Sequence, residues 1–311
     1  MKKKLVKLLH DNVKQLNQAF LNGHQASCLD EKEQAAFEKD ALEMSERGAK
    51  VVSAKISGDI MNVMAYEQQT QVEYITVIDR LLKQGTMMFM EERTMRRRAR
   101  FEGSKLVSDE AVPVHPLSLQ ERGEKCSGQI YREDSSTYNR RNAVRYAEQW
   151  WNDYNPAFVR FEDNCTNFVS QCLYAGGASM TSKASKQRGW WYTNEQTMSL
   201  SWSVAHSFRW YLSGATSHLR GEEKKSAHEL IPGDVICYDF NGNGTWNHCA
   251  IVVAKDINNE PLVNAQTVNS RYRFWTYQNS PAYTDQIQYK FFSYLHLSRN
   301  RFFLLFFLCL S

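Results

Sequence analysis

Apolar residues recur with two different periods in the first third of this chain of 311 residues. From residue 2 to residue 48 they return every three or four positions, which predicts helix with one apolar stripe. From residue 51 to residue 101 β-branched, aromatic and methionine residues dominate, with a break at Gln84-Gly85, which predicts antiparallel strands. Residues 1–105 therefore predict a small accessory α+β domain in which helix precedes a curled sheet.

A polar stretch with little periodicity follows at residues 106–136 and contains two of the six prolines. This composition is typical of a linker. Helical and strand-like patterns resume at residue 137 and continue to residue 292, which predicts a second domain. The last segment, 293–311, is an apolar tail that is too short to span a bilayer as a helix.

The second domain contains a strong helical pattern directly after Asp163 and Asn164, both of which are good N-cap residues. Gly176-Gly177 gives a stop signal, and one helical face collects the apolar residues Phe168, Val169, Cys172 and Leu173. Cys165 therefore falls in the first turn of a buried helix, where the helix dipole favours a thiolate and free N–H groups can form an oxyanion hole. The alternative is a buried structural thiol.

His248 stands just before a short apolar, β-branched run at residues 250–253, which predicts a buried strand with His248 at its mouth. A nucleophile and its base need to be neighbours only in the fold, so their separation in sequence is no obstacle. The next strand-like run, residues 261–267, places Asn264 and Gln266 on one face. Either amide could accept from the imidazole and fix its tautomer. We take Cys165 and His248 as the candidate catalytic pair, with Gln266 first and Asn264 second as the orienting group.

Several ordered motifs of the second domain resemble a known family. They include residues 164–171, Gly176-Gly177, Trp190-Trp191-Tyr192, Pro232-Gly233-Asp234 and Trp246-Asn247-His248. Together they resemble the putative amidase domain family of Firmicutes, which belongs with the NlpC/P60, CHAP and papain-like cysteine hydrolases. The resemblance covers residues 137–292 and implies an α+β, papain-like fold of the NlpC/P60 type, with a helix packed on an antiparallel sheet.

The resemblance also implies roles, with Cys165 as nucleophile and His248 as base. The family tends to carry a histidine before threonine where Gln266-Thr267 stands, so the orienting position departs from its pattern. The implied activity is cysteine-dependent hydrolysis of an amide bond in cell-wall peptide or an N-acyl compound, through a thioester and without metal or organic cofactor. Two alternatives are an acyltransferase with the same pair, and a decayed hydrolase that only binds.

Substrate contacts are expected from residues beside the pair. The candidates are Asn164, Trp190, Trp202 and Trp246. Aromatic side chains between the nucleophile and the base could line a cleft for glycan or peptide, but packing beneath a loop is an equal alternative.

Composition excludes some partners. The net charge of +4 with interspersed acidic residues gives no case for nucleic-acid binding. The lysine-rich N-terminus is not followed by an apolar core, so we expect no secretory signal, no stable membrane span and a cytoplasmic protein, with association with cell wall or spore left open. Peptidoglycan or another amide substrate is the expected partner, and the pattern predicts no oligomeric state.

Five arginines gather near the end of the first domain, at positions 93, 96, 97, 98 and 100. Arginine matches oxyanions bidentately, so this cluster could bind an anionic polymer. Charge patterning more often marks a solvated strand face, which is the interpretation we favour.

Two patterns could suggest metals. Residues 239–244 match the opening of a calcium loop, but Ala250 stands where the bidentate glutamate should be, which favours a turn between strands. Cys237, His248 and Cys249 fit no usual zinc spacing. We therefore expect no metal.

Overall fold

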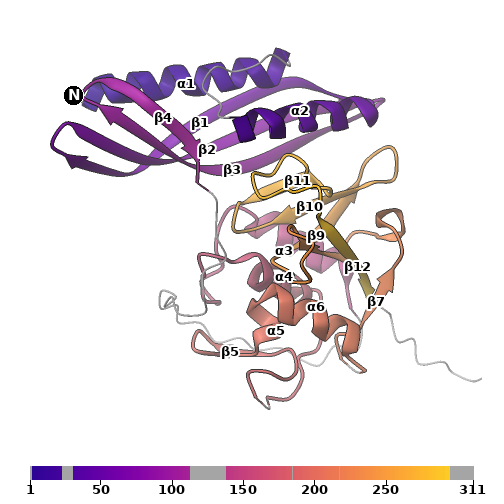
Figure 1. Cartoon of the computed structure of the whole chain (residues 1–311). Coiled ribbons are helices and arrows are strands. Elements are labelled where there is room, and N and C mark those ends of the chain that lie inside the picture. Colours follow the sequence, from indigo (N-terminus) through magenta and orange to yellow (C-terminus); the bar gives the residue numbers. More distant parts are fainter. Residues whose placement is uncertain (1, 23–30, 113–137, 184, 217, 295–311) are drawn as a thin grey trace, which may run out of the picture.

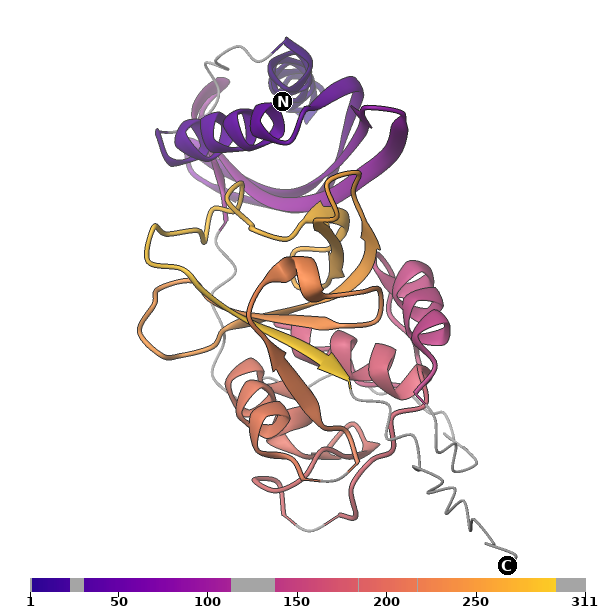
Figure 2. The ribbon, with the colours of Figure 1, turned by 90° about the vertical axis from the view of Figure 1, so that its right-hand side faces the viewer.

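A computed structural model describes residues 2–22, 31–112, 138–183, 185–216 and 218–294. The first domain consists of α1 (Lys2–Asn22), α2 (Glu31–Glu46), β1 (Ala49–Tyr66), β2 (Gln69–Gln84), β3 (Met87–Glu102) and β4 (Lys105–Ala111). Its long strands curl around the two helices (Figure 2). No helix within the described ranges is long and apolar enough to cross a membrane.

The second domain begins with two helices and ends with strands. Its elements are α3 (Arg140–Trp150), α4 (Cys165–Ala175), β5 (Tyr192–Asn194), β6 (Thr197–Met198), α5 (Leu200–Ser203), α6 (Ala205–Gly214), β7 (Gly221–Lys224), the 3₁₀ helix η1 (Ala227–Glu229), β8 (Val235–Asp239), β9 (His248–Lys255), β10 (Pro261–Ala265), β11 (Ser270–Phe274) and β12 (Gln288–Tyr294). The α+β class predicted from sequence is confirmed, with a large antiparallel sheet.

One sheet runs through both domains (Figure 1). Its strand order is β1-β2-β3-β11-β10-β9-β8-β12-β7, with β4 paired to β3. The domains join where β3 pairs antiparallel with β11, so that Ser270 lies opposite Arg93. A buried apolar cluster spans the junction and contains Leu82 and Phe89 of the first domain with Leu262 and Phe274 of the second. The two domains therefore share both a sheet and part of a core.

The prediction of a linker over residues 106–136 is wrong at its start, because Lys105–Ala111 form β4. The strand was missed because a polar residue points inward. Asp109 is buried and accepts hydrogen bonds from Arg97 Nε at 3.1 Å and from the hydroxyl of Tyr74 at 2.5 Å. An inward carboxylate removes the alternation that identifies a strand. Residues 113–136, and the apolar tail from residue 295 onward, lie outside the described residues.

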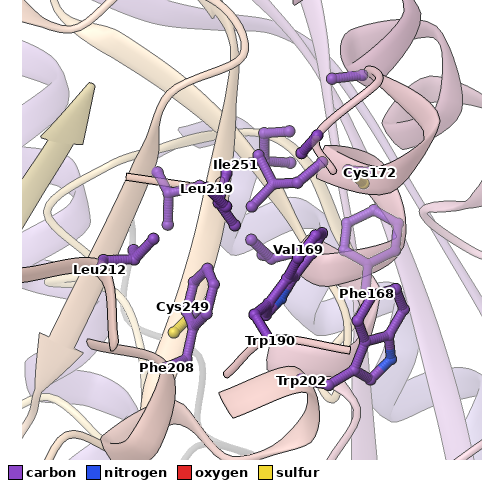
Figure 3. Close-up of a cluster of buried hydrophobic side chains, with 14 of the residues drawn as sticks. Phe168, Val169, Cys172, Trp190, Trp202, Phe208, Leu212, Leu219, Cys249 and Ile251 are labelled. Atoms are coloured by element: carbon purple, nitrogen blue, oxygen red, sulfur yellow. The ribbon is translucent and has the colours of Figure 1, made fainter. Parts of the chain in front are cut away.

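The helix carrying Cys165 packs into the main core of the second domain (Figure 3). The four residues predicted to form its buried face, Phe168, Val169, Cys172 and Leu173, are fully buried, which confirms that prediction. They meet Cys249 and Ile251 of β9, which face the helix. The chain leaves the helix through Gly176 and Gly177, and Gly177 adopts the left-handed conformation (φ +99°) that glycine permits without strain.

The prediction that the arginines at positions 93–100 lie on a solvated strand face is only partly correct. Arg100 is exposed, but Arg93 and Arg97 are buried, with 5% and 1% of their surface accessible. Arg97 forms ion pairs with Glu33 of α2 and with Asp109 of β4. The cluster on β3 therefore serves the interior of the first domain as well as its surface.

Candidate active site

Cys165 is the first residue of α4, and its N-terminus is capped from another strand. The hydroxyl of Thr267, just after β10, accepts hydrogen bonds from the N–H groups of Asn164 (2.9 Å) and Cys165 (3.0 Å). The same hydroxyl donates to Asp163 Oδ1 at 2.9 Å. Asn164 occupies the N-cap position without making a side-chain cap, so Thr267 performs that function.

Thr267 has a φ of +91°, a left-handed conformation that is unfavourable for a β-branched residue. Such strain persists only where surrounding contacts over-determine it, and it is frequent at functional sites. No local feature of the sequence shows that the Thr267 hydroxyl reaches the N-terminus of a distant helix, so this role could not be predicted. The one available signal was that Thr267 follows Asn264 and Gln266, the two polar residues at the end of the predicted strand.

The thiol of Cys165 is buried, with 2% of the residue accessible. Its Sγ lies 3.6 Å from Asp163 Oδ1 and 3.7 Å from Thr166 Oγ1. Burial, followed by the charge of Asp163 and then by Cys249, raises the pKa of the Cys165 thiol well above its usual value. The thiolate expected from the helix dipole is therefore absent at rest, because burial and a neighbouring carboxylate outweigh the dipole.

His248 opens β9 as predicted, and its ring lies in an aromatic pocket formed by Tyr238, Phe240 and Tyr277. Its Nε2 is 3.0 Å from the hydroxyl of Tyr277. Burial, together with the positive charge of Arg273, lowers the pKa of His248 to about 3, so the imidazole is neutral at pH 7.

No hydrogen bond joins His248 to Cys165 within the part of the chain that the structure describes. Strand alternation explains this. Cys249 faces α4, whereas His248 pairs with Tyr238 and points to the opposite face of the sheet. The Tyr277 hydroxyl bonds to His248, and burial first, with Cys165 adding to a smaller degree, raises the pKa of that hydroxyl.

The amides predicted to orient His248 are bonded elsewhere. Gln266 donates to the carbonyl oxygens of Trp150 (2.6 Å) and Asp153 (2.8 Å) and accepts from Asn164 Nδ2. Asn264 donates to Glu148 Oε1 at 2.8 Å. Because Asn264 lies opposite Ile251, both amides project toward α3, on the face that His248 avoids. In this geometry, Tyr277 is the group that contacts the imidazole.

The residues predicted to contact substrate are also in the interior. Asn164 Oδ1 accepts from the N–H of Phe161 (3.0 Å) and from Asn167 Nδ2 (2.9 Å). Trp190 and Trp202 are fully buried, and Trp246 belongs to the same core. In this structure Asn164 is held by hydrogen bonds and the three tryptophans pack in the core, and none of the four lines the cavity described next.

A cavity of about 650 Å³ lies between the two domains. On the side of the second domain it is lined by Asp163, His248, Thr267 and Tyr277, and on the other side by residues of α2 and β3. The thiol of Cys165 lies directly behind this wall, since it donates to Asp163. Cavities of this size accommodate a small ligand.

The structure shows the two segments whose sequence patterns suggested metal binding, residues 239–244 and the set Cys237, His248 and Cys249. Asp239 closes the turn between β8 and β9 by accepting from the N–H groups of Asn241 (3.2 Å) and Gly244 (2.6 Å), which confirms the predicted turn. The thiols of Cys237 and Cys249 lie 3.6 Å apart on the face opposite His248. Among the described residues no three potential ligands form a metal-binding group.

Comparison with known proteins supports the resemblance to the putative amidase domain family. Residues 137–292 match the family described as "Putative amidase domain". The chain is also 42% identical over 257 residues to the uncharacterized protein YhbB of Bacillus subtilis (strain 168), covering 80% of this chain and 82% of that protein. This alignment is longer than the matched domain, so the relative shares sequence outside it. No solved structure matches the chain.

Proposed function

The chain belongs to the putative amidase domain family, and from that premise we propose that it is a cysteine-dependent amide hydrolase, with Cys165 as nucleophile and His248 as base. One observation carries the proposal. His248, the first residue of β9, lines the interdomain cavity together with Asp163, whose carboxylate accepts from the thiol of Cys165, the first residue of α4. A cysteine at a helix N-terminus that packs on an antiparallel sheet also supports a papain-like relationship. The proposed substrate is a cell-wall peptide or another N-acyl amide.

The reaction follows from the charge states at rest. Because thiol and imidazole are both neutral, His248 takes the proton of Cys165 as Sγ bonds to the carbonyl carbon. The carbon–nitrogen bond then breaks, and the imidazolium returns its proton to the leaving amine. Water, deprotonated by His248, hydrolyses the thioester and releases the acid and the free thiol. The N–H of Cys165 is the nearest donor for the oxyanion.

The His248 side chain must first turn toward Cys165, because at rest it points to the face of the sheet opposite the cysteine helix. Two contacts must also change before this sequence can run. Tyr277 must release His248 Nε2, and Thr267 must share the N–H of Cys165 with the oxyanion. Both partners are hydroxyl groups, which rotate at little cost. Substrate entering the cavity is placed to displace both, because Thr267 and Tyr277 line it.

The test is release of free amine from purified peptidoglycan and from N-acyl peptides. We expect Cys165→Ala to lower the rate by about a thousandfold or more, since the nucleophile is lost. Cys172→Ala is the matched control, because it removes a buried thiol from the same helix. It should keep the wild-type rate within a few fold. Equal rates for wild type and Cys165→Ala would reject the proposal.

Binding without catalysis is the second candidate. It is favoured by the protonated thiol, the capped N–H of Cys165 and the occupied Nε2 of His248. In that case wild type releases no amine from any amide tested, while wild type and Cys165→Ala bind the same peptide equally well.

A further inference from the structure

The interdomain cavity has a strongly cationic lining. Among the described residues that line it, the charged groups apart from His248 are Lys32, Lys39, Arg93, Arg96, Arg273 and the single acid Asp163. The whole chain carries a net charge of only +4, so positive charge is concentrated here. A cavity lined by one sign of charge attracts ligands of the other sign.

Lys39 and Arg96 of this lining pair with protein carboxylates. Lys39 pairs with Asp285 at 2.7 Å, and Arg96 pairs with Glu73 at 2.9 Å. Arg273 differs, because only 3% of it is accessible and its Nε donates at 3.0 Å to the amide oxygen of Asn279, a neutral group. Within the described part of the chain Arg273 forms no ion pair with a carboxylate.

A buried guanidinium without a counter-charge is unfavourable, and such charges are normally paired. Arg273 stacks on Tyr277, with its guanidinium carbon 3.9 Å from the ring centroid, so its position is fixed. It is also close enough to His248 to contribute to the lowered pKa of that residue, after burial. An anion bound at Arg273 would therefore lie close to the proposed base.

Arg93 adds a second buried cation from the other domain. Arg93 lies on β3 and pairs with Ser270 of β11, the strand that also carries Arg273. Arg93 lines the same cavity. Burial first, then Arg80 and to a smaller degree Arg273, lowers the pKa of Arg93 to about 10, while Asp40 and Glu91 act in the opposite direction. The two buried arginines therefore influence each other across the domain junction.

We infer that the cavity binds an amide substrate that carries a free carboxylate, held between Arg273 of the second domain and Arg93 of the first. The inference rests on the proposed amide hydrolase, since a peptide substrate supplies such a carboxylate at its end or on an acidic side chain. Guanidinium groups match carboxylates bidentately. The first domain thereby gains a function, because it supplies half of the substrate site.

The test is a ligand-observed NMR titration of the full chain carrying Cys165→Ala, with N-acetyl-alanyl-alanine and with its C-terminal amide as probes. The two probes have nearly the same shape and differ in charge. We expect the acid to bind about tenfold more tightly, as one charge-assisted contact provides. Adding Arg273→Gln should remove this preference, and Arg273→Lys should retain part of it.

Arg100→Gln is the matched control, because Arg100 is an exposed arginine on the same strand β3 and does not line the cavity. It should leave the preference unchanged. If Arg273→Gln does not fold, the titration in rising sodium chloride replaces it, and the preference should fall with salt.

Equal binding of acid and amide by Cys165→Ala would overturn the inference, as would a preference that survives Arg273→Gln or does not fall with salt. Inorganic phosphate that competes as strongly as the acid would also overturn it, because the site would then bind any anion. Failure of the hydrolase proposal is a separate result. Binding is measured without the nucleophile, so a lack of amine release by wild type does not alter it.

Discussion

The two domains stabilise their interiors by different interactions. In the first domain, Arg80 is buried and bonds to Asp40 of α2 and, at 2.6 Å, to Glu91 of the neighbouring strand. In the second domain, Trp202 packs in an aromatic cluster, with ring centroids 4.9 Å from Trp190 and 5.9 Å from Phe158. One interior therefore depends on charge balance and the other on apolar contact.

This difference matters because the interdomain cavity, the proposed active site, lies where the two interiors meet. Asp40, a partner of Arg80, also accepts at 2.7 Å from Asn279, which in turn binds Arg273. The charged interior of the first domain is thus continuous with the proposed substrate site, whereas the aromatic cluster supports α4 from behind. Substitutions of charged residues in the first domain should therefore change stability in a pH-dependent way. Substitutions that change the shape of the aromatic cluster in the second domain should change stability independently of pH.

The largest effect is expected from Arg80→Met. Burial alone would raise the pKa of Asp40, but Arg80 and Arg93 hold it at about 2. Removing Arg80 leaves buried carboxylates without their partner, which should lower the free energy of unfolding by about 3–5 kcal/mol at pH 7. The deficit should shrink at pH 4, because a buried Asp40 without Arg80 takes up a proton.

Urea unfolding of wild type and Arg80→Met at both pH values provides the measurement. Arg98→Met is the control, because Arg98 lies on β3 in a partly exposed pair with Glu73 and should cost less than about 1 kcal/mol. Equal losses for the two variants would remove the distinction between the domains.

The next effect concerns Glu43 of α2, which accepts a hydrogen bond from Thr276 of the second domain. Burial, with Asp40 and Glu91 adding to it, raises the pKa of Glu43 from 4.5 to about 7. The folded state therefore favours the protonated form, and stability should fall as the pH rises from 4.5 through 7. Glu43→Gln removes the charge and should stabilise the chain at pH 8 by about 3 kcal/mol at most, with little effect at pH 4.

Thermal unfolding of wild type and Glu43→Gln across this range tests the sign. Glu46→Gln replaces an exposed carboxylate at the end of the same helix and should leave the pH dependence of wild type unchanged. A Glu43→Gln variant that is less stable than wild type at pH 8 would show that Glu43 works as an anion.

A smaller, pH-independent loss is expected in the aromatic interior. Trp202→Phe removes the indole N–H that donates to Asn167 Oδ1 at 2.8 Å, and it leaves that oxygen buried. Such a change costs about 1–3 kcal/mol. Trp210→Phe, at an exposed position, should stay within about 0.5 kcal/mol of wild type. If the loss of stability for Trp202→Phe varied between pH 5 and pH 8, the interior of the second domain would also depend on charge.

Sequence predictions succeed where a feature depends on residues that are close in sequence, and they fail where it depends on residues that are far apart. The placement of Cys165 in the first turn of a helix and of His248 at the mouth of a strand depends on neighbouring residues, and α4 and β9 confirm both. The pairing of β3 with β11 joins positions almost 180 residues apart and has no local signal. The contact of Tyr277 with His248 likewise joins residues far apart in sequence and has no local signal.

The orienting amides show a subtler limit. Asn264 and Gln266 do share one strand face, as alternation predicted. Which face that is depends on the register between β9 and β10, because a shift of one residue exchanges the two faces. Sequence periodicity fixes the alternation within a strand but not the register between strands, so His248 received the wrong partners.

The smallest expected effect tests the contact between the two domains at His248, the proposed base. Tyr277, whose hydroxyl bonds to His248 Nε2, follows Thr276, which α2 holds through Glu43. Tyr277→Phe frees that nitrogen, and losing one hydrogen bond of about 0.5–1.5 kcal/mol should raise the rate of Cys165 alkylation by iodoacetamide by about two- to tenfold at pH 7. Tyr289→Phe is the control, since its hydroxyl bonds to the carbonyl of Thr276 at 2.8 Å and should leave the rate unchanged. If Tyr277→Phe reacts no faster than wild type, then Tyr277 does not restrain the pair, and the resting thiol is limited by its burial beside Asp163 alone.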